Sequence, residues 1–261
     1  MDLQLTDRTV LVTGGSSGVG LATVRILLEE GANVATCARR LDVLEKALAD
    51  IGAPADRVLA RTCDVRDPDV VRALLTATER RFGGLDGLVN NAGQSRMKAL
   101  ANATTEDFRD ELDLKFSGVL NTVTAALPLL RRSPVAAIVN LNAVLAKQPE
   151  PRLVTTSAAR AGLLNLTKSM ALEYAPEIRV NSVCLGLIDT GQWRRRHQES
   201  GTQLGFAQWE RELAADRGIA AGRFGSADEV AAMIVTLLSP RASYVTGASL
   251  DVCGGVSRYV G

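Results

Sequence analysis

The chain has 261 residues, of which 46% are hydrophobic and 23% charged, and its 30 basic and 29 acidic side chains leave a formal net charge of +1. This length suffices for one large domain with a sizeable core, and we expect a single domain over residues 1–261. Because the charge is balanced and the basic residues are scattered apart from the run 194–196, we expect no nucleic-acid partner.

The positions of the cysteines and the N-terminal residues indicate the cellular compartment in which the protein works. The four cysteines lie far apart and form no C-x-x-C pair: Cys37, Cys63, Cys184 and Cys253. This spacing predicts free thiols in a reducing compartment. The first residues lack a basic segment followed by a long apolar one, and no apolar run approaches the ~18 residues that span a bilayer. We therefore expect a cytoplasmic protein without a membrane partner.

Histidine and tyrosine are scarce in this chain. It holds one histidine, His197, and three tyrosines, Tyr174, Tyr244 and Tyr259. With one imidazole available, a histidine-based metal site or a Ser-His-Asp triad is nearly excluded, and we predict no metal site. Acid–base chemistry must therefore come from other side chains.

Short apolar runs alternate with longer amphipathic segments, which predicts strands and helices in turn. The predicted strands are Thr9–Val12, Asn33–Cys37, Gly87–Asn90, Ala136–Leu141, Arg179–Cys184 and Ser249–Val252. The predicted helices are Gly18–Glu30, Leu41–Ile51, Asp67–Phe82, Thr105–Leu130, Thr156–Tyr174 and Ala227–Leu238. Near-continuous apolar strands separated by helices are typical of a parallel sheet covered on both faces. The predicted fold class is therefore α/β, a single doubly wound parallel sheet flanked by helices.

One stretch breaks this alternation. Residues 190–222 form a long polar insertion rich in Arg, Gln and Glu before the last helix. Loops of this length in compact domains are commonly lids or binding loops, so we predict a lid over a substrate site. A solvated surface excursion is the alternative.

The first strand leads directly into a glycine-rich segment, Thr13–Gly20. Glycines at this strand-turn-helix junction allow a tight turn, a close approach to a pyrophosphate and packing of the helix on the sheet. The following helix N-terminus presents free N–H groups to phosphate. The predicted phosphate-binding residues are Gly14, Ser16, Ser17, Gly18, Val19 and Gly20.

The end of the second strand predicts which dinucleotide binds. A carboxylate there accepts hydrogen bonds from a ribose 2′-OH, whereas cations favour a 2′-phosphate. This chain has no acid at that point and two adjacent arginines, Arg39 and Arg40. Guanidinium groups suit bidentate phosphate contacts, so NADP(H) is favoured over NAD(H). The alternative is that both arginines are solvated at the helix start.

Further motifs follow in order along the chain. They are Thr13–Gly20, Asp64–Val65, Asn90–Gly93, Arg179–Ser182, Gly186–Thr190 and Asp251–Gly255. With these motifs the whole chain resembles the short-chain dehydrogenase/reductase family, which implies a Rossmann-type fold. The resemblance also implies a homodimer or homotetramer formed through the long helices near 105–130 and 156–174.

The resemblance assigns more residues to a cofactor cleft. It implies that Asp64 and Val65 contact adenine and that the backbone around Asn90 and Gly93, with Asn91 between them, lines the cleft. It implies that Ile188 and Thr190 approach the nicotinamide carboxamide. The remaining cofactor-binding residues expected from the same motifs are Ala92, Gly93 and Gly186.

The four catalytic positions of the family are changed in this chain. Where the family has Asn, Ser, Tyr and Lys, alignment of the motifs places Lys115, Ala143, Thr156 and Arg160. An aliphatic hydroxyl is far less acidic than a phenol, so Thr156 is no comparable proton donor. Arg160 can still donate hydrogen bonds to a ribose and so belongs to the expected cofactor site, but its pKa prevents it from relaying protons.

Lys115 is the most informative of these substitutions. In a partly desolvated cleft near Arg160, a lysine can serve as a general acid or base or as an anion anchor. We hypothesise that Lys115 has this role, with Asn142, Thr155, Thr156 or Ser157 as hydrogen-bonding partners. The alternative is that Lys115 pairs with Asp113 or Glu111, or points to solvent.

The predicted lid opens with a tryptophan and three arginines. Three guanidinium groups beside an indole suit a small anionic or aromatic ligand, and Trp193 and Arg194 are the expected substrate-loop residues. A solvated helix with Trp193 docked on the core is the alternative.

Three functions remain open from the sequence. The first is an NADP(H)-dependent oxidoreductase that acts on a carbonyl, hydroxyl or activated double bond without the catalytic tyrosine. The second is a non-redox enzyme of aldol-like, cyclising or isomerising type, with Lys115 and Arg160 stabilising an enolate or oxyanion. The third is an inactive nucleotide-binding or structural subunit. The glycine-rich segment favours the first.

Overall fold

A computed structural model describes residues 1–95 and 97–259, so residues 96, 260 and 261 of the predicted domain lie outside the described part. Seven strands in this part form one sheet in the order β3-β2-β1-β4-β5-β6-β7, and all neighbouring strands are parallel. The strands are β1 (Thr9–Thr13), β2 (Asn33–Ala38), β3 (Val58–Thr62), β4 (Gly87–Asn90), β5 (Ala137–Ala143), β6 (Arg179–Leu185) and β7 (Ser249–Val252). The predicted doubly wound α/β sheet is confirmed.

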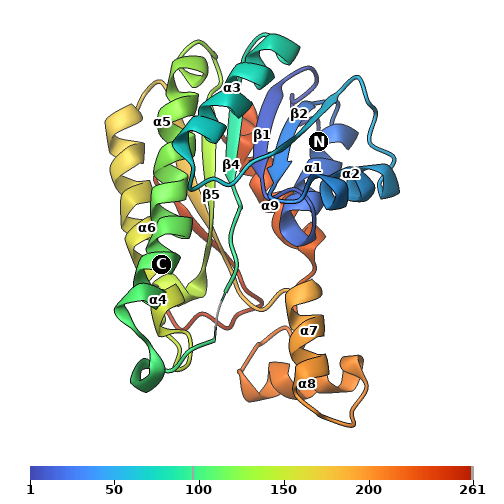
Figure 1. Cartoon of the computed structure of the whole chain (residues 1–261), viewed down its shortest axis with the longest axis vertical. Helices are drawn as coiled ribbons and strands as arrows, with labels where there is room; N and C mark the ends of the chain where they lie inside the picture. The colour runs from blue at the N-terminus through green and yellow to red at the C-terminus, as the bar shows by residue number, and fades with distance from the viewer. Residues whose placement is uncertain (96, 260–261) are drawn as a thin grey trace.

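Helices cover both faces of the sheet, as Figure 1 shows. On one face, α1 (Gly18–Glu29), α2 (Leu41–Asp50) and α9 (Ala227–Leu238) pack on β1, β2, β4 and β5 through Leu27, Leu44 and Ile234. The other face is covered by α3 (Pro68–Phe82), α5 (Gly118–Leu130) and α6 (Val154–Tyr174). Burial of strands on both faces explains why their sequences are near-continuous apolar runs.

Capping residues set several helix starts. Asp67 accepts hydrogen bonds from the N–H groups of Asp69 and Val70, and Pro68 occupies the first turn of α3. Ser226 and Glu229 form a capping box at the start of α9. These side chains satisfy N–H groups that have no partner inside the helix, so the chain turns from loop to helix at these points.

Strand β3 was not among the predicted strands. Its sequence, Val58–Thr62, has two apolar residues followed by Ala, Arg and Thr, and its last two residues are exposed. It lies at the edge of the sheet. An edge strand buries too few side chains to produce a recognisable apolar run, which is the physical reason for the omission.

The predicted helix Thr105–Leu130 is not continuous. It consists of α4 (Thr105–Leu112), a π-helical turn over Asp113–Ser117, and α5. A π turn inserts extra backbone into a helix and is frequent at functional sites. This turn contains Lys115, so the irregularity changes where that side chain points relative to α4.

The insertion over residues 190–222 is largely helical. It contains α7 (Gly191–Glu199) and α8 (Phe206–Asp216), which extend from one end of the molecule beyond the sheet (Figure 1). The expectation of a loop was therefore wrong for much of the segment. Short 3₁₀ turns cover Leu100–Asn102, Val144–Ala146 and Pro240–Ala242. No helix among the described residues is long and apolar enough to cross a membrane.

A buried polar ladder joins the centre of the sheet to the helices on one face. Asn90 on β4 donates to Asn140 on β5 at 2.8 Å and accepts from Thr122 on α5 at 2.6 Å. Asn140 in turn donates to Thr167 on α6 at 2.9 Å. These four side chains are at most 5% exposed. Because buried polar groups are costly when unpaired, the ladder specifies how α5 and α6 dock.

We predict that Asn140→Ala destabilises the protein by about 2–3 kcal/mol, because it leaves the Asn90 amide and the Thr167 hydroxyl without these partners. Urea unfolding measures the change. Asn165→Ala, at an exposed position of α6, is the control and should change stability by less than about 0.5 kcal/mol. Equal effects of the two substitutions would contradict the role assigned to the ladder.

Candidate functional site

The described part of the chain has a cleft of about 910 Å³ at the carboxyl ends of the strands. Its lining comes from the segments that follow β1, β4, β5 and β6, together with α6 and α7. Strand order reverses between β1 and β4, and open α/β sheets bind ligands at such a switch point. The topology thus places the cleft where a nucleotide site is expected.

The glycine-rich turn after β1 forms one wall of the cleft. Gly14 has φ +72°, and a Cβ there would lie 3.0 Å from the Ala92 Cα. A Cβ on Gly20 would lie 2.2 Å from the Gly14 carbonyl oxygen, so Gly20 serves the packing of α1 on the turn. The predicted residues that line the cleft are Gly14, Ser16, Ser17, Gly18 and Val19, whereas Gly20 lies behind them.

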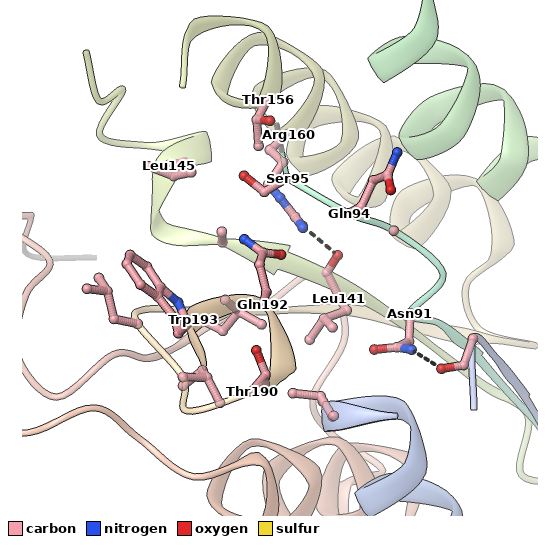
Figure 2. A pocket seen from close by; sticks show the side chains of 18 of the residues that line it. Asn91, Gln94, Ser95, Leu141, Leu145, Thr156, Arg160, Thr190, Gln192 and Trp193 are labelled. Carbon is pink, nitrogen blue, oxygen red and sulfur yellow. Dashed lines mark hydrogen bonds between the residues drawn. The ribbon is translucent and has the colours of Figure 1, made fainter. Parts of the chain in front are cut away.

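Hydrogen bonds tie the turn to the loop after β4. The Asn91 side chain donates to the Thr13 and Gly14 carbonyl oxygens at 2.9 and 3.0 Å, and Figure 2 draws one hydrogen bond from this side chain. The Thr13 hydroxyl accepts from the N–H groups of Asn91 and Ala92, each at 3.0 Å. Asn91, Ala92 and Gly93 consequently lie along the cleft, as the family resemblance implies.

Polar and charged residues surround the end of the cleft formed by β2 and the segment after β3. Arg39, Arg40, Asp64 and Val65 all line it. Asp64 accepts from the Arg66 guanidinium at 2.5 Å. This pairing with Arg66 and the more distant charge of Arg39 lower the pKa of Asp64, although its partial burial opposes the effect. An anionic carboxylate and two arginine side chains thus lie together at this end.

The segment after β6 supplies the opposite wall. Gly186, Ile188 and Thr190 line the cleft, and the Gly225 N–H donates to the Leu187 carbonyl oxygen at 2.9 Å. The Asp189 N–H donates to the Gly225 carbonyl oxygen at 2.8 Å. This backbone pairing holds the wall against the segment that precedes α9.

Thr156 and Arg160 on α6 line the cleft near Ser95, with Gln192 and Trp193 on its far side (Figure 2). Ala143 also lines it. The Arg160 guanidinium donates to the Leu141 carbonyl oxygen at 3.0 Å. Burial lowers the pKa of Arg160 from its ordinary value, and the Glu111 carboxylate opposes this effect. Arg160 is therefore a half-buried cation at the centre of the site.

Lys115 lies behind the cleft wall, outside the cleft lining. It is 3% exposed and forms an ion pair with Glu111, which is also 3% exposed. Its ammonium also donates to the Gln94 carbonyl oxygen at 2.6 Å. The structure therefore agrees with the alternative in which Lys115 pairs with Glu111, and the ammonium does not line the cleft.

Asn142 also lies outside the cleft lining. Its side chain donates to the Arg160 carbonyl oxygen at 3.1 Å and accepts from the Ala143 N–H at 2.9 Å. Ser157, another expected partner of Lys115, donates instead to the Leu153 carbonyl oxygen at 2.8 Å. Asn142 therefore braces the backbone around Arg160 and Ala143.

Glu111 is the residue in this region that the sequence analysis did not select for chemistry. The Thr156 hydroxyl donates to Glu111 Oε2 at 3.1 Å, and the same oxygen pairs with Lys115. Thr156 is therefore connected to Lys115 through the carboxylate. The spacing of the two residues in the sequence could have indicated this pair, because an acid four residues before a lysine lies on the same side of a helix.

The three arginines of α7 lie differently relative to the cleft. Arg194 pairs with Asp189 at 2.6 Å and lies over Phe206, outside the cleft lining. Arg195 and Arg196 line the cleft instead. Arg196 lies 4.5 Å from the Trp193 ring centroid, and its buried Nη2 finds no hydrogen-bond partner among the described residues.

Trp193 lies between the cleft and the aromatic side chains of the insertion. It lines the cleft and also packs at 5.1 Å from Phe224 and 6.2 Å from Trp209. His197 contacts Phe206 and Trp209, and its Nε2 lies 2.9 Å from the Leu204 carbonyl oxygen. This aromatic cluster holds α7 and α8 together. Within the described residues, no three His, Cys, Asp or Glu side chains are grouped so that they could hold a metal.

The chain is similar over nearly its whole length to a family model and to known reductases. A family model described as enoyl-(acyl carrier protein) reductase matches residues 14–257. A putative ketoacyl reductase of Streptomyces coelicolor is 36% identical over 258 residues, which cover 95% of this chain and 97% of that protein. L-sorbose reductase from Gluconobacter frateurii, solved with NADPH and L-sorbose, is 30% identical with a TM-score of 0.94, and both chains are fully covered.

A short-chain oxidoreductase from Pseudomonas aeruginosa PAO1, described as containing an atypical catalytic center, shows greater identity. It is 47% identical to this chain, and the alignment covers 98% of this chain and 99% of that one. The TM-score is 0.94 for its apo structure and 0.93 for its NADPH-bound structure.

The ion pair makes a testable prediction for stability. Lys115→Met should destabilise the protein by about 3–5 kcal/mol, because it leaves the Glu111 carboxylate buried without its cation. The double variant Glu111→Leu/Lys115→Met should recover most of this loss, because neither charge remains. Urea unfolding of the three proteins gives the comparison.

Lys98→Met is the matched control, because Lys98 pairs with Asp107 at a more exposed position, and it should cost at most about 1 kcal/mol. If the Lys115 single variant and the double variant lose the same stability, the buried ion pair does not have the energetic role described here.

Proposed function

This chain belongs to the short-chain dehydrogenase/reductase family, and we propose that it is an NADP(H)-dependent oxidoreductase that works without the family's catalytic tyrosine. Its substrate carries a carbonyl, a hydroxyl or an activated double bond. The observation that supports this most strongly is the intact nucleotide cleft, together with 47% identity to an NADPH-bound oxidoreductase with an atypical catalytic center.

The residues of the cleft fit a dinucleotide. Gly14 has a positive φ of +72°, which suits the tight glycine turn that lets a backbone approach a pyrophosphate, and the N-terminus of α1 faces the same space. Arg160 and Thr190 line the part of the cleft expected to hold the nicotinamide half. When bound, the nicotinamide supplies or accepts a hydride.

We propose NADP(H) rather than NAD(H) from the residues that would surround the 2′ position of the adenosine ribose. Arg39 and Arg40 both line the cleft at the end of β2. Their guanidinium groups can hold a 2′-phosphate through charge-assisted hydrogen bonds, whereas a 2′-hydroxyl gains much less from them.

Proton transfer cannot use the usual phenol in this arrangement. Tyr174 lies at the end of α6, and Tyr244 and Tyr259 are exposed; each of the three lies outside the cleft lining in the described structure. Thr156 is the hydroxyl at the corresponding place. The proposed reaction therefore needs a proton path of different composition.

The two other functions weighed from the sequence receive less support. A non-redox reaction was based on a Lys115 ammonium beside the substrate, but this group is paired with Glu111 behind the cleft. An inactive subunit would not need the unpartnered Arg196 Nη2 at the cleft, and a buried donor without a partner is costly.

We propose a small anionic or aromatic substrate for the outer part of the cleft. The Arg196 guanidinium and the Trp193 ring lie together there, and Arg195 adds a second cation. A carboxylate or phosphate on the substrate would supply the missing acceptor for Arg196.

Assembly as a homodimer or homotetramer is proposed from exposed apolar side chains. Leu112 and Leu120 are exposed on α4 and α5, and Leu172 on α6 is 72% exposed. Such residues on long helices suit packing against a second copy.

The cysteines are the basis for proposing a compartment. All four thiols are free of disulfide bonds, which supports a location in a reducing compartment such as the cytoplasm.

Cofactor preference provides one test. Arg39→Ala/Arg40→Ala should weaken NADPH binding on the order of 10- to 100-fold and leave NADH binding nearly unchanged, because each charged hydrogen bond contributes about 1.5–3 kcal/mol. Titration of cofactor fluorescence measures both affinities. Arg61→Ala removes a nearby charge outside the cleft lining and is the control. Parallel weakening for both cofactors would contradict the 2′-phosphate assignment.

Turnover provides the direct test. The protein should oxidise NADPH with at least one member of a panel of carbonyl compounds that includes anionic aromatic ketones. Arg196→Ala should raise the KM of anionic members on the order of tenfold, whereas Arg194→Ala should have little effect, because Arg194 contacts Asp189 and Phe206. Conversion without net NADPH oxidation, or no turnover with the whole panel, would contradict the proposed function.

A further inference from the structure

A line of hydrogen-bonded groups runs from the cleft into the protein interior. The Thr156 hydroxyl, at the cleft wall, donates to Glu111 Oε2 at 3.1 Å. The same oxygen accepts from the Lys115 ammonium, which also donates to the Gln94 carbonyl oxygen at 2.6 Å. The cleft is therefore connected to a buried ammonium group through a hydroxyl and a carboxylate.

The burial of these groups makes a purely structural role a poor explanation. Thr156 is fully buried, and Glu111 and Lys115 are each 3% exposed. Replacing a buried ion pair by packed apolar side chains is commonly neutral or stabilising, so such a pair is weak evidence for a role in stability alone. Lys115 also lies in a π turn, and such turns are frequent at functional sites.

We propose that Thr156, Glu111 and Lys115 form a proton relay that replaces the tyrosine as the source and sink of the reacting proton. The proposal rests on the proposed oxidoreductase function. Thr156 is the catalytic residue because it lines the cleft. Its hydroxyl, which is buried and turned toward Glu111 in this structure, reaches the reacting oxygen by rotation about the Cα–Cβ bond, whereas Glu111 and Lys115 act through it.

The protons balance along this relay. In reduction, the carbonyl carbon gains a hydride from the bound reduced nicotinamide, and the carbonyl oxygen gains the hydroxyl proton of Thr156. The Thr156 oxygen receives a proton through the Glu111 carboxyl group, which takes it from the Lys115 ammonium. Lys115 becomes a neutral amine and Glu111 remains a carboxylate. Oxidation of an alcohol moves the same protons in the opposite direction and begins with Lys115 as a neutral amine. The alcohol proton then passes to the Thr156 oxygen, while the Thr156 hydroxyl proton passes along the observed hydrogen bond to Glu111 and on to the amine.

Neighbouring groups account for the charge left by this transfer. After reduction the pair of Glu111 and Lys115 carries one negative charge, and the nearby Arg160 guanidinium stabilises it electrostatically. The Lys115 ammonium donates to the carbonyl oxygen of Gln94, an exposed residue, and in the proposed relay the amine regains its proton from solvent on that side. Arg160 thus stabilises charge without carrying a proton.

The first experiment removes the hydroxyl and leaves the ion pair intact. Thr156→Val should lower the NADPH-dependent rate on the order of 100-fold, the usual contribution of a positioned general acid. Thr156→Ser should restore most of the rate, and NADPH affinity should stay within about threefold in both variants. Thr78→Val, at a fully buried threonine of α3, is the control. A Thr156→Val rate near that of the control would overturn the relay.

The second experiment asks whether the three residues act as a unit. Thr156→Val, Glu111→Leu/Lys115→Met and the triple variant should lose similar factors in rate, because groups that act together are not additive. The solvent isotope effect and the pH dependence of the rate should change in the same way in all three. Multiplying rate losses, or unchanged pH profiles, would contradict a shared proton path.

A third measurement does not depend on turnover. The protein has five lysines, so nitrogen NMR of lysine-labelled protein can follow each amine, with the double variant assigning Lys115. The relay predicts that Thr156→Val shifts the Lys115 nitrogen signal, because the ammonium shares a Glu111 oxygen with the Thr156 hydroxyl. A Lys115 signal that does not respond to this substitution overturns the relay, whereas absence of carbonyl reduction by the wild type overturns the proposed function.

Discussion

The ion pair between Lys115 and Glu111 is the constraint on which the arrangement of the candidate site depends. A buried ammonium needs an anion beside it, because without one the free energy of its lost hydration is not compensated. Through this pair the π turn is joined to the loop at Gln94 and to Thr156 on α6. Three segments far apart in the sequence thus meet behind the cleft at one charge.

The cleft and its chemistry have separate structural origins. Nucleotide-binding features follow from the parallel sheet, which brings the ends of β1, β4 and β6 to one edge. The groups of the proposed proton relay instead come from α6, the end of α4 and the π turn. A family member can therefore keep the cofactor site while the proton path changes, since the two depend on different contacts.

The sequence predicted the sheet and the glycine-rich turn, because apolar runs and glycine spacing are local signals. Other features depend on side-chain direction in three dimensions. Arg196 and Trp193 are three residues apart and share one side of α7, whereas the adjacent Arg194 points elsewhere; this distinction is lost when the segment is treated as a loop. Glu111 was weighed as a partner of Lys115, but its contact with Thr156 depends on how α4 and α6 pack.

The structure of the complex with NADPH, solved by crystallography, tests the central claim most directly. The account predicts that the nicotinamide half contacts Thr156 and Arg160, that no tyrosine hydroxyl lies beside the reactive ring, and that Thr156 remains hydrogen-bonded to Glu111. A cofactor bound elsewhere, or a tyrosine from any subunit placed at the reactive ring, would contradict it.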